Sequence, residues 1–217
     1  MFLSEPQIFK CDVGQTMRYL DGEYCYDLNS PDRHDPDLPL AQSRAHGGTM
    51  ILWKRSLDPF IIREETSTSA FLPILFQPPD TEPTIHFAVY LPTRGQENLF
   101  LDELACLSAS LDFYRTKYPA SSIYLRGDFN ISRNNTHRNG LLDCFMNVEG
   151  LYEVPINHTT YHHFRGGGSS DSHLDKLLLY QVPSSPSTSE ALQNVFCNLQ
   201  EPLVESHHDI IMSRLLT

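Results

Sequence analysis

The sequence predicts an α+β sandwich, in which two packed sheets are flanked by helices. Short apolar runs recur at close spacing and are separated by proline and acidic turns, which is typical of consecutive strands. Only two segments have clear helical periodicity, and neither an internal repeat nor a domain-sized change of composition divides the 217 residues. A chain of this length can bury one good core, so we expect a single domain.

The first half of the chain is predicted to be mostly strands. Residues 1–4 form a short strand that ends at Glu5, and residues 11–46 form a long surface loop with one strand near "EYCYDL". Four apolar runs follow, each short and bounded by turn residues, which predicts four strands. These runs are Thr49 to Trp53, Pro59 to Ile62, Phe71 to Phe76 and Thr84 to Leu91.

The second half is predicted to contain both helices. Apolar residues fall at helical spacing from Glu97 to Tyr114, and Pro119 lies just beyond this segment. A shorter helix covers Arg138 to Met146, directly after the strand in "SIYLRGDFNIS". The remaining elements are a loop with "TTYHHFRGGGSSDS", a strand "HLDKLLLY", a Ser/Pro-rich linker over 183–189, and two apolar runs around Val195 and Ile210.

The composition predicts a soluble, monomeric, intracellular protein of the nucleus or cytoplasm that is neither secreted nor membrane-bound. No run approaches the roughly 20 apolar residues of a membrane span, and the first residues lack the apolar stretch of a signal peptide. Five scattered cysteines without CxxC spacing argue against a disulfide framework and a zinc ribbon. The net charge of -11 argues against tight DNA binding, although carboxylates that hold a divalent cation still permit cleavage of a nucleic acid.

Polar side chains gather at the predicted strand ends. Asp128 and Asn130 lie two positions apart on an extended chain, so they project together while Phe129 turns back toward the core. An Asx-type turn explains the same residues, because Gly, Asp and Asn all favour turns. The other strand ends carry Glu5, Tyr90, Asp175, His207 and His208.

The order and spacing of these groups resemble the endonuclease/exonuclease/phosphatase superfamily, a four-layered α/β sandwich of metal-dependent phosphoesterases. Within it, the sequence is most similar to the endonuclease domain of non-LTR retrotransposons. The similarity covers nearly the whole chain and is most specific at "LRGDFN". The other matching pieces are "FLSEPQ", "VYLPT", "SHLDKLL" and "SHHDII".

The resemblance implies hydrolysis of a DNA phosphodiester with Mg²⁺ or Mn²⁺, in a domain whose parent polyprotein contains a reverse transcriptase. Asp128 would position and deprotonate the attacking water, and Asn130 and Tyr90 would hydrogen-bond the phosphate. His208 would stabilise the pentacovalent state, oriented and kept cationic by Asp175. Water activation and charge neutralisation are the two requirements of this reaction.

The resemblance also assigns residues around these five, with two departures from the family pattern. Glu5 and His207 would hold the metal, and Ser172 and Arg165 would contact the substrate. The family's first strand, which carries an asparagine at the metal site, has no counterpart, so we expect a domain over residues 1–217 that is truncated at its amino terminus. His207 replaces an aspartate, and a neutral imidazole should weaken affinity for Mg²⁺.

Three alternatives remain open from the sequence. The domain could keep the fold without the chemistry and bind a partner, which the missing strand and His207 favour. It could instead be a phosphatase acting on a small molecule or a lipid headgroup, which the acidic charge would tolerate better than DNA. The histidines in "NHTTYHHF" could also hold zinc, since His158, His162 and His163 have suitable spacing.

Overall fold

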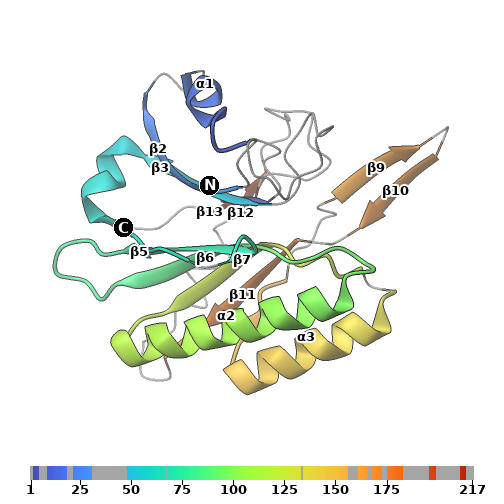
Figure 1. The fold of residues 1–217 in the computed structure, drawn as a ribbon. Coiled ribbons are helices and arrows are strands. Elements are labelled where there is room, and N and C mark those ends of the chain that lie inside the picture. The colour runs from blue at the N-terminus through green and yellow to red at the C-terminus, as the bar shows by residue number, and fades with distance from the viewer. Residues whose placement is uncertain are drawn as a thin grey trace.

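The computed structural model describes residues 2–4, 9–18, 22–30, 48–66, 68–132, 134–155, 161–165, 168–172, 175–182, 196–198 and 211–213. Within these residues, two sheets lie face to face between helical layers (Figure 1). The long helices α2 (Glu97–Lys117) and α3 (Thr136–Glu149) cover one outer face, and the short helix α1 (Val13–Met17) lies on the other. The predicted α+β sandwich of four layers is therefore confirmed.

The six-stranded sheet has the order β4-β5-β6-β7-β11-β8. Its neighbours are antiparallel except β6 and β7, which run parallel and are joined by the crossover through α2. Because helices pack on one face and a second sheet on the other, β5 and most of β6 are buried on both sides and read as continuous apolar runs. The strands are β4 (Ile61–Arg63), β5 (Phe71–Phe76), β6 (Thr84–Tyr90), β7 (Ile123–Asp128), β8 (Tyr152–Glu153) and β11 (Asp175–Tyr180).

The second sheet has five strands in the order β12-β13-β1-β3-β2. The short strand β1 pairs with β3 on one side and with β13 on the other, and it also lies against β6 and β7 of the first sheet. A separate hairpin of β9 and β10 projects away from both sheets (Figure 1). The bounds are β1 (Phe2–Ser4), β2 (Tyr24–Asn29), β3 (Thr49–Lys54), β9 (Tyr161–Arg165), β10 (Gly168–Ser172), β12 (Phe196–Asn198) and β13 (Ile211–Ser213).

Three apolar clusters correspond to the three gaps between the four layers. The largest joins the six-stranded sheet to α2 and α3, through residues such as Phe87, Phe100 and Leu142. A second, which includes Trp53 and Ala88, lies between the two sheets. The third joins α1 to the outer face of β3. Each sheet face and helix stripe is thus covered by a neighbouring layer.

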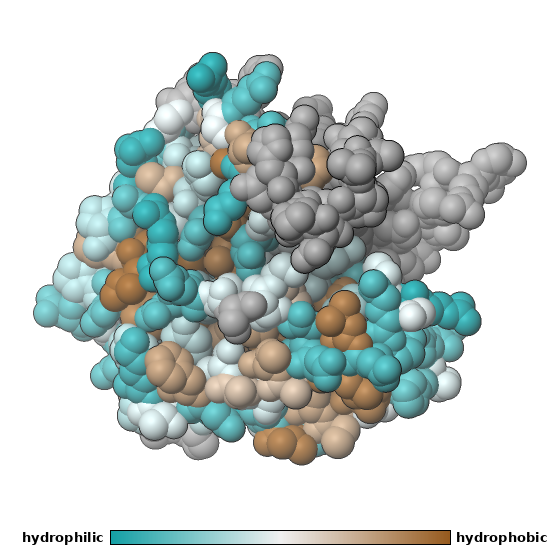
Figure 2. All heavy atoms as spheres, in the orientation of Figure 1, coloured by the Kyte–Doolittle hydropathy of each residue, from teal (hydrophilic) through white to brown (hydrophobic). Residues whose placement is uncertain are grey.

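The outer surface of the helix layer is mixed in character. Apolar side chains such as Leu101 and Phe113 are exposed on α2. Figure 2 shows brown and teal residues mixed over the face that it presents. Single exposed apolar residues of this kind are ordinary on a protein surface. Among the described residues, neither helix combines the length and the apolar character that crossing a bilayer requires.

Three expected elements differ from the structure. Residues 55–60 form a 3-10 helix, η2 (Arg55–Phe60), so the strand expected from Pro59 to Ile62 is wrong in its first half. The fixed φ of Pro59 suits a 3-10 turn, and Ile61 begins β4 only after it. The expected loop around "TTYHHFRGGGSSDS" is the β9–β10 hairpin, and the expected long loop over 11–46 also contains α1.

Candidate active site at the edge of the six-stranded sheet

Three of the residues singled out from the sequence lie side by side at one edge of the six-stranded sheet. Tyr90 ends β6 and is the register partner of Asp128, which ends β7. Asp128 is in turn the register partner of Asp175, which begins β11. Since neighbouring strands lie about 4.8 Å apart, the three backbones form a row about 10 Å long.

This row faces the layer between the two sheets. Side chains alternate along a strand, and Phe87, Val89 and Leu125 belong to the helix-side core. Tyr90 and Asp128 therefore point to the opposite face, where β1 packs against β6 and β7. Asp128 and Asp175 are buried, with 1% and 5% of their surfaces exposed, whereas Tyr90 is partly exposed.

The backbone around Asp128 explains why glycine and asparagine flank it. Gly127 has φ 141°, a conformation that a residue with a Cβ rarely adopts. Asn130 has φ 52°, in the left-handed region that asparagine tolerates better than most residues. The Asp128 Oδ1 atom accepts a hydrogen bond of 2.7 Å from the Asn130 backbone N–H. The Asx-type turn considered from the sequence is thus present, and it fixes the orientation of the Asp128 carboxylate at the strand end.

Asn130 also connects the ends of the two parallel strands. Its side-chain Nδ2 donates to the Leu91 carbonyl at 2.7 Å, and the Leu91 N–H donates to the Asp128 carbonyl at 2.9 Å. One of the two amide hydrogens of Asn130 is therefore used within the protein, and the amide carries two. Contact between Asn130 and a phosphate, which the sequence resemblance implies, stays a prediction.

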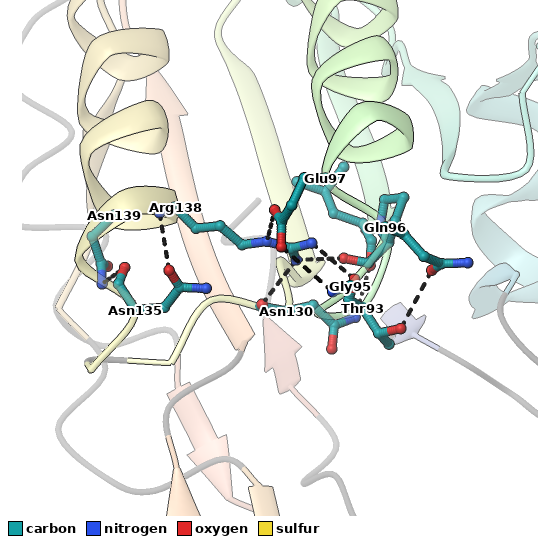
Figure 3. Close-up of polar contacts among 10 residues, drawn as sticks. Thr93, Gly95, Gln96, Glu97, Asn130, Asn135, Arg138 and Asn139 are labelled. Carbon is teal, nitrogen blue, oxygen red and sulfur yellow. Dashed lines mark hydrogen bonds and ion pairs between the residues drawn. The ribbon is translucent and has the colours of Figure 1, made fainter.

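Arg138 belongs to this site although the sequence analysis gave it no role. It is fully buried in the first turn of α3, and its guanidinium bonds to the segments that follow β6 and β7 (Figure 3). A signal was present in the sequence, because Arg138 lies on the same helical stripe as Leu142 and Phe145, both of which are buried. A charged residue on an apolar stripe next to a predicted site indicates an inward-facing contact.

A second buried cation lies on the same face as Asp128. Arg126 is two positions before Asp128, is 2% exposed, and holds its guanidinium 5.3 Å from the centre of the Tyr124 ring. Burial lowers the pKa of Arg126 to about 10, so the side chain remains cationic at neutral pH. The same Tyr124 ring also stacks on His86, with the two ring centres 4.9 Å apart. The layer between the sheets thus contains a fixed positive charge close to the row of Tyr90, Asp128 and Asp175.

The two carboxylates of the row, Asp128 and Asp175, favour a hard divalent cation nearby. Mg²⁺ and Mn²⁺ prefer oxygen donors, and Mg²⁺ is commonly held by one or two carboxylates together with water and substrate oxygens. Asp128 and Asp175 place two buried carboxylates in adjacent register positions, and their negative charge favours a cation nearby. The described part of the chain contains no cluster of three or more metal-ligating side chains. Metal binding at this site stays a prediction.

The other predicted site residues are not described in full. Glu5, His207 and His208 lie outside the described residues. Arg165 ends β9 and Ser172 ends β10, but only the backbone of this hairpin is described. The roles assigned to these five residues stay predictions, as does zinc binding by the histidines at 158, 162 and 163.

Comparison with known proteins supports the fold through structure rather than through sequence. No protein-family profile matches the chain, and no curated protein matches it. The endonuclease domain of TRAS1, a telomere-specific non-LTR retrotransposon, superimposes with a TM-score of 0.59 at 14% identity, over 95% of this chain and 93% of its own.

Two further solved structures have the same fold. D. rerio TDP2, complexed with a single-strand DNA product, gives a TM-score of 0.52 at 14% identity, covering 86% of this chain and 72% of its own. ANGEL2, a 2',3'-cyclic phosphatase, gives 0.54 at 15% identity, covering 82% and 68%. The fold expected from the sequence resemblance is thereby confirmed, because these three structures share it.

Proposed function

We propose that this chain, which has the fold of the endonuclease/exonuclease/phosphatase superfamily, is a metal-dependent phosphodiesterase that nicks DNA. The observation that carries the proposal is the row of Tyr90, Asp128 and Asp175 in adjacent register at one sheet edge. These residues come from three separate sequence motifs, and each motif was singled out for phosphate chemistry. The likeness to the TRAS1 endonuclease domain, over nearly the full length of both chains, supports DNA as the substrate.

In this proposal each residue of the site has a separate role in the reaction. Asp128 accepts a proton from the attacking water, while its Oδ1 atom remains oriented by the Asn130 N–H. The Tyr90 hydroxyl and the second amide hydrogen of Asn130 donate to the phosphate oxygens. Asp175 orients His208, which stabilises the charge that develops on the phosphoryl group. Each role uses a group whose chemistry matches the step.

Glu5 and His207 would hold a Mg²⁺ or Mn²⁺ ion. When bound, the ion supplies Lewis-acid neutralisation of charge on the phosphate. Ser172 and Arg165, at the ends of the two hairpin strands, would contact the substrate. We further propose that the domain derives from a retrotransposon polyprotein that also carries a reverse transcriptase, and that it acts inside the cell as a monomer.

Relaxation of supercoiled plasmid in Mg²⁺ tests the proposal. Asp128→Asn is the informative variant, because asparagine keeps an oxygen that accepts the Asn130 N–H but cannot take the proton from water. We expect nicking to fall by at least about 100-fold, with an unchanged thermal unfolding midpoint. Asp143→Asn, on the exposed surface of α3, is the matched control and should nick like the wild type. Equal nicking by the wild type and Asp128→Asn would refute the assignment.

A second candidate is a phosphatase or phosphodiesterase of small molecules. The likeness to ANGEL2, a 2',3'-cyclic phosphatase, and the net charge of -11 favour it. A panel of cyclic nucleotides, phosphorylated lipid headgroups and plasmid DNA, each assayed with the wild type and Asp128→Asn, separates the two candidates. Turnover of a small substrate that depends on Asp128, without plasmid nicking, would favour the phosphatase.

A further inference from the structure

Arg138 is a fully buried cation, and its guanidinium donates hydrogen bonds to residues next to the candidate site. Its Nε donates to Glu97 Oε2 at 2.8 Å, and one terminal nitrogen donates to the Thr93 carbonyl at 2.8 Å. The other terminal nitrogen donates to the Pro92 carbonyl at 2.6 Å and to the Asn130 carbonyl at 3.3 Å. Burying a cation is costly unless it is paired and hydrogen-bonded, and Arg138 is both.

The acceptors of Arg138 belong to two segments far apart in the sequence. Pro92 and Thr93 follow directly after β6, which ends with Tyr90. Asn130 follows directly after β7, which ends with Asp128. Figure 3 shows Arg138 reaching from α3 toward both segments and toward Glu97 at the start of α2. One side chain therefore joins the chain immediately after two of the three residues in the row.

The geometry of this contact requires an arginine. The planar guanidinium presents donors in fixed directions, which lets one group bond to a carboxylate and three carbonyls at the same time. Its central carbon lies over the Phe100 ring, 4.3 Å from the ring centre, which adds a cation–π contact. A lysine ammonium is a compact point charge with three donors, so it cannot reproduce this set of directions.

The helix that carries Arg138 is itself fixed to the same segment. Asn135 caps α3, because its Oδ1 accepts the Arg138 backbone N–H at 3.2 Å. Asn139 donates to the Ser132 carbonyl at 3.0 Å, which ties the first turn of α3 to the residues just after Asn130. The guanidinium therefore extends from a backbone position that is already set relative to β7.

We propose that Arg138 is a positioning residue for the phosphodiesterase site, which holds the ends of β6 and β7 so that Tyr90 and Asn130 meet the same phosphate. The inference rests on the proposed function and adds to it a residue that does not touch the substrate. It follows that the loss of Arg138 disturbs the relative placement of the two strand ends, whereas the loss of a partly buried arginine elsewhere in the helix layer has no such effect.

Arg115 provides the matched control. It also makes a partly buried ion pair between α2 and α3, bonding to Glu149 at 2.5 Å and lying 4.3 Å from the Tyr180 ring. Arg115 and Glu149 are near the carboxyl ends of these helices, whereas Arg138 is at the amino end of α3. A helix of 21 residues is about 30 Å long, so Arg115 is far from the sheet edge that carries Asp128.

The test compares Arg138→Ala, Arg138→Lys, Arg115→Ala and Arg115→Lys with the wild type in plasmid nicking, scaled to the folded fraction measured by urea unfolding. We expect both Arg138 variants to lose about 10- to 100-fold in kcat with little change in KM. Both Arg115 variants should keep the wild-type kcat for each folded molecule. A wild-type kcat in Arg138→Ala, or an equal loss in Arg115→Ala, would overturn the inference.

Amide hydrogen exchange provides a readout that needs no activity, so failure of the proposed function is distinguishable from failure of this inference. The relevant amides are those of Leu91 and Asn130, which bond to the Asp128 carbonyl and carboxylate. We expect Arg138→Ala to speed exchange at both by at least about tenfold, with no change in Arg115→Ala. Unchanged exchange in Arg138→Ala would overturn the inference even if the wild type proved inactive on DNA.

Discussion

His86 is a titratable side chain that the fold buries in the layer between the two sheets. It is 2% exposed, stacks on Tyr124 and shares a 2.9 Å hydrogen bond with the Thr84 hydroxyl through its Nε2. Burial, and then the positive charge of Arg126, hold the pKa of His86 well below its ordinary value of 6.5. The folded protein therefore keeps this imidazole neutral, whereas the unfolded chain binds a proton below pH 6.5.

This difference predicts a loss of stability in mild acid that depends on His86. As pH falls below 6.5, proton binding favours the unfolded chain, by about 2 kcal/mol between pH 7 and pH 5. His86→Gln cannot bind this proton but retains a polar group near Thr84. Urea unfolding at several pH values should show a steeper decline for the wild type than for His86→Gln. Parallel stability curves would contradict the prediction.

At the scale of single residues, some site positions were predicted from the sequence and others were missed. Tyr90, Asp128 and Asp175 were singled out because polar groups at strand ends are conspicuous, and the strand register then places them side by side. Their catalytic roles stay predictions. Arg138 was missed because a charged residue is usually solvated, so composition alone does not indicate that it faces inward. Its place on the helical stripe of Leu142 and Phe145 indicates that it faces inward, but its acceptors in the surrounding loops are known only from the structure.

Elements that bury an apolar face were predictable, whereas elements held by local backbone contacts were not. Helix α2 and strand β5 follow the expected ranges closely because their residues repeat with the periods of a helix and of a buried strand. The 3-10 helix η2 leaves no such pattern, since it depends on Pro59 and on a 2.9 Å bond from Trp53 to Asp58. The β9–β10 hairpin lacks apolar alternation and was expected to be a loop.

The β2–β3 pair gives a prediction at the level of an element. Gly48 precedes β3 with φ 85°, and a Cβ there would lie 2.7 Å from the Asn29 carbonyl oxygen at the end of β2. Gly22 also has a positive φ, 68°, but has no atom within 4 Å of the corresponding position. Gly22→Ala should therefore cost only the conformational strain, about 1 kcal/mol, and Gly48→Ala should cost at least about 2 kcal/mol.

Chemical unfolding of the two variants measures this difference directly. Asn29 also donates to the Thr68 and Phe71 carbonyls, which connects β2 to the chain around β5 of the other sheet. Displacement of Asn29 by a new methyl group would disturb that connection as well, which adds to the strain at Gly48. Equal destabilisation by the two substitutions would show that the contact with Asn29 relaxes without cost.

For the whole molecule, the net charge of -11 predicts weak intrinsic affinity for DNA. Proteins that bind duplexes without sequence preference depend on many contacts between cations and phosphates. In EDTA and about 150 mM salt, we expect a dissociation constant above about 1 µM for a fluorescent duplex, measured by anisotropy. A second measurement at low salt should show only a shallow salt dependence, because few phosphates are neutralised. Submicromolar binding in EDTA would contradict this expectation.

The pairing of β1 with β13 has a consequence for how the protein is made. Phe2 lies opposite Ile211, which follows every strand of the six-stranded sheet in the sequence, since those strands all come from residues between 61 and 180. During synthesis the ribosome releases every strand of the larger sheet before β13 exists. The smaller sheet can therefore close only after β13 has been synthesised, and a nascent chain stalled short of residue 211 would leave β1 without one of its two neighbours.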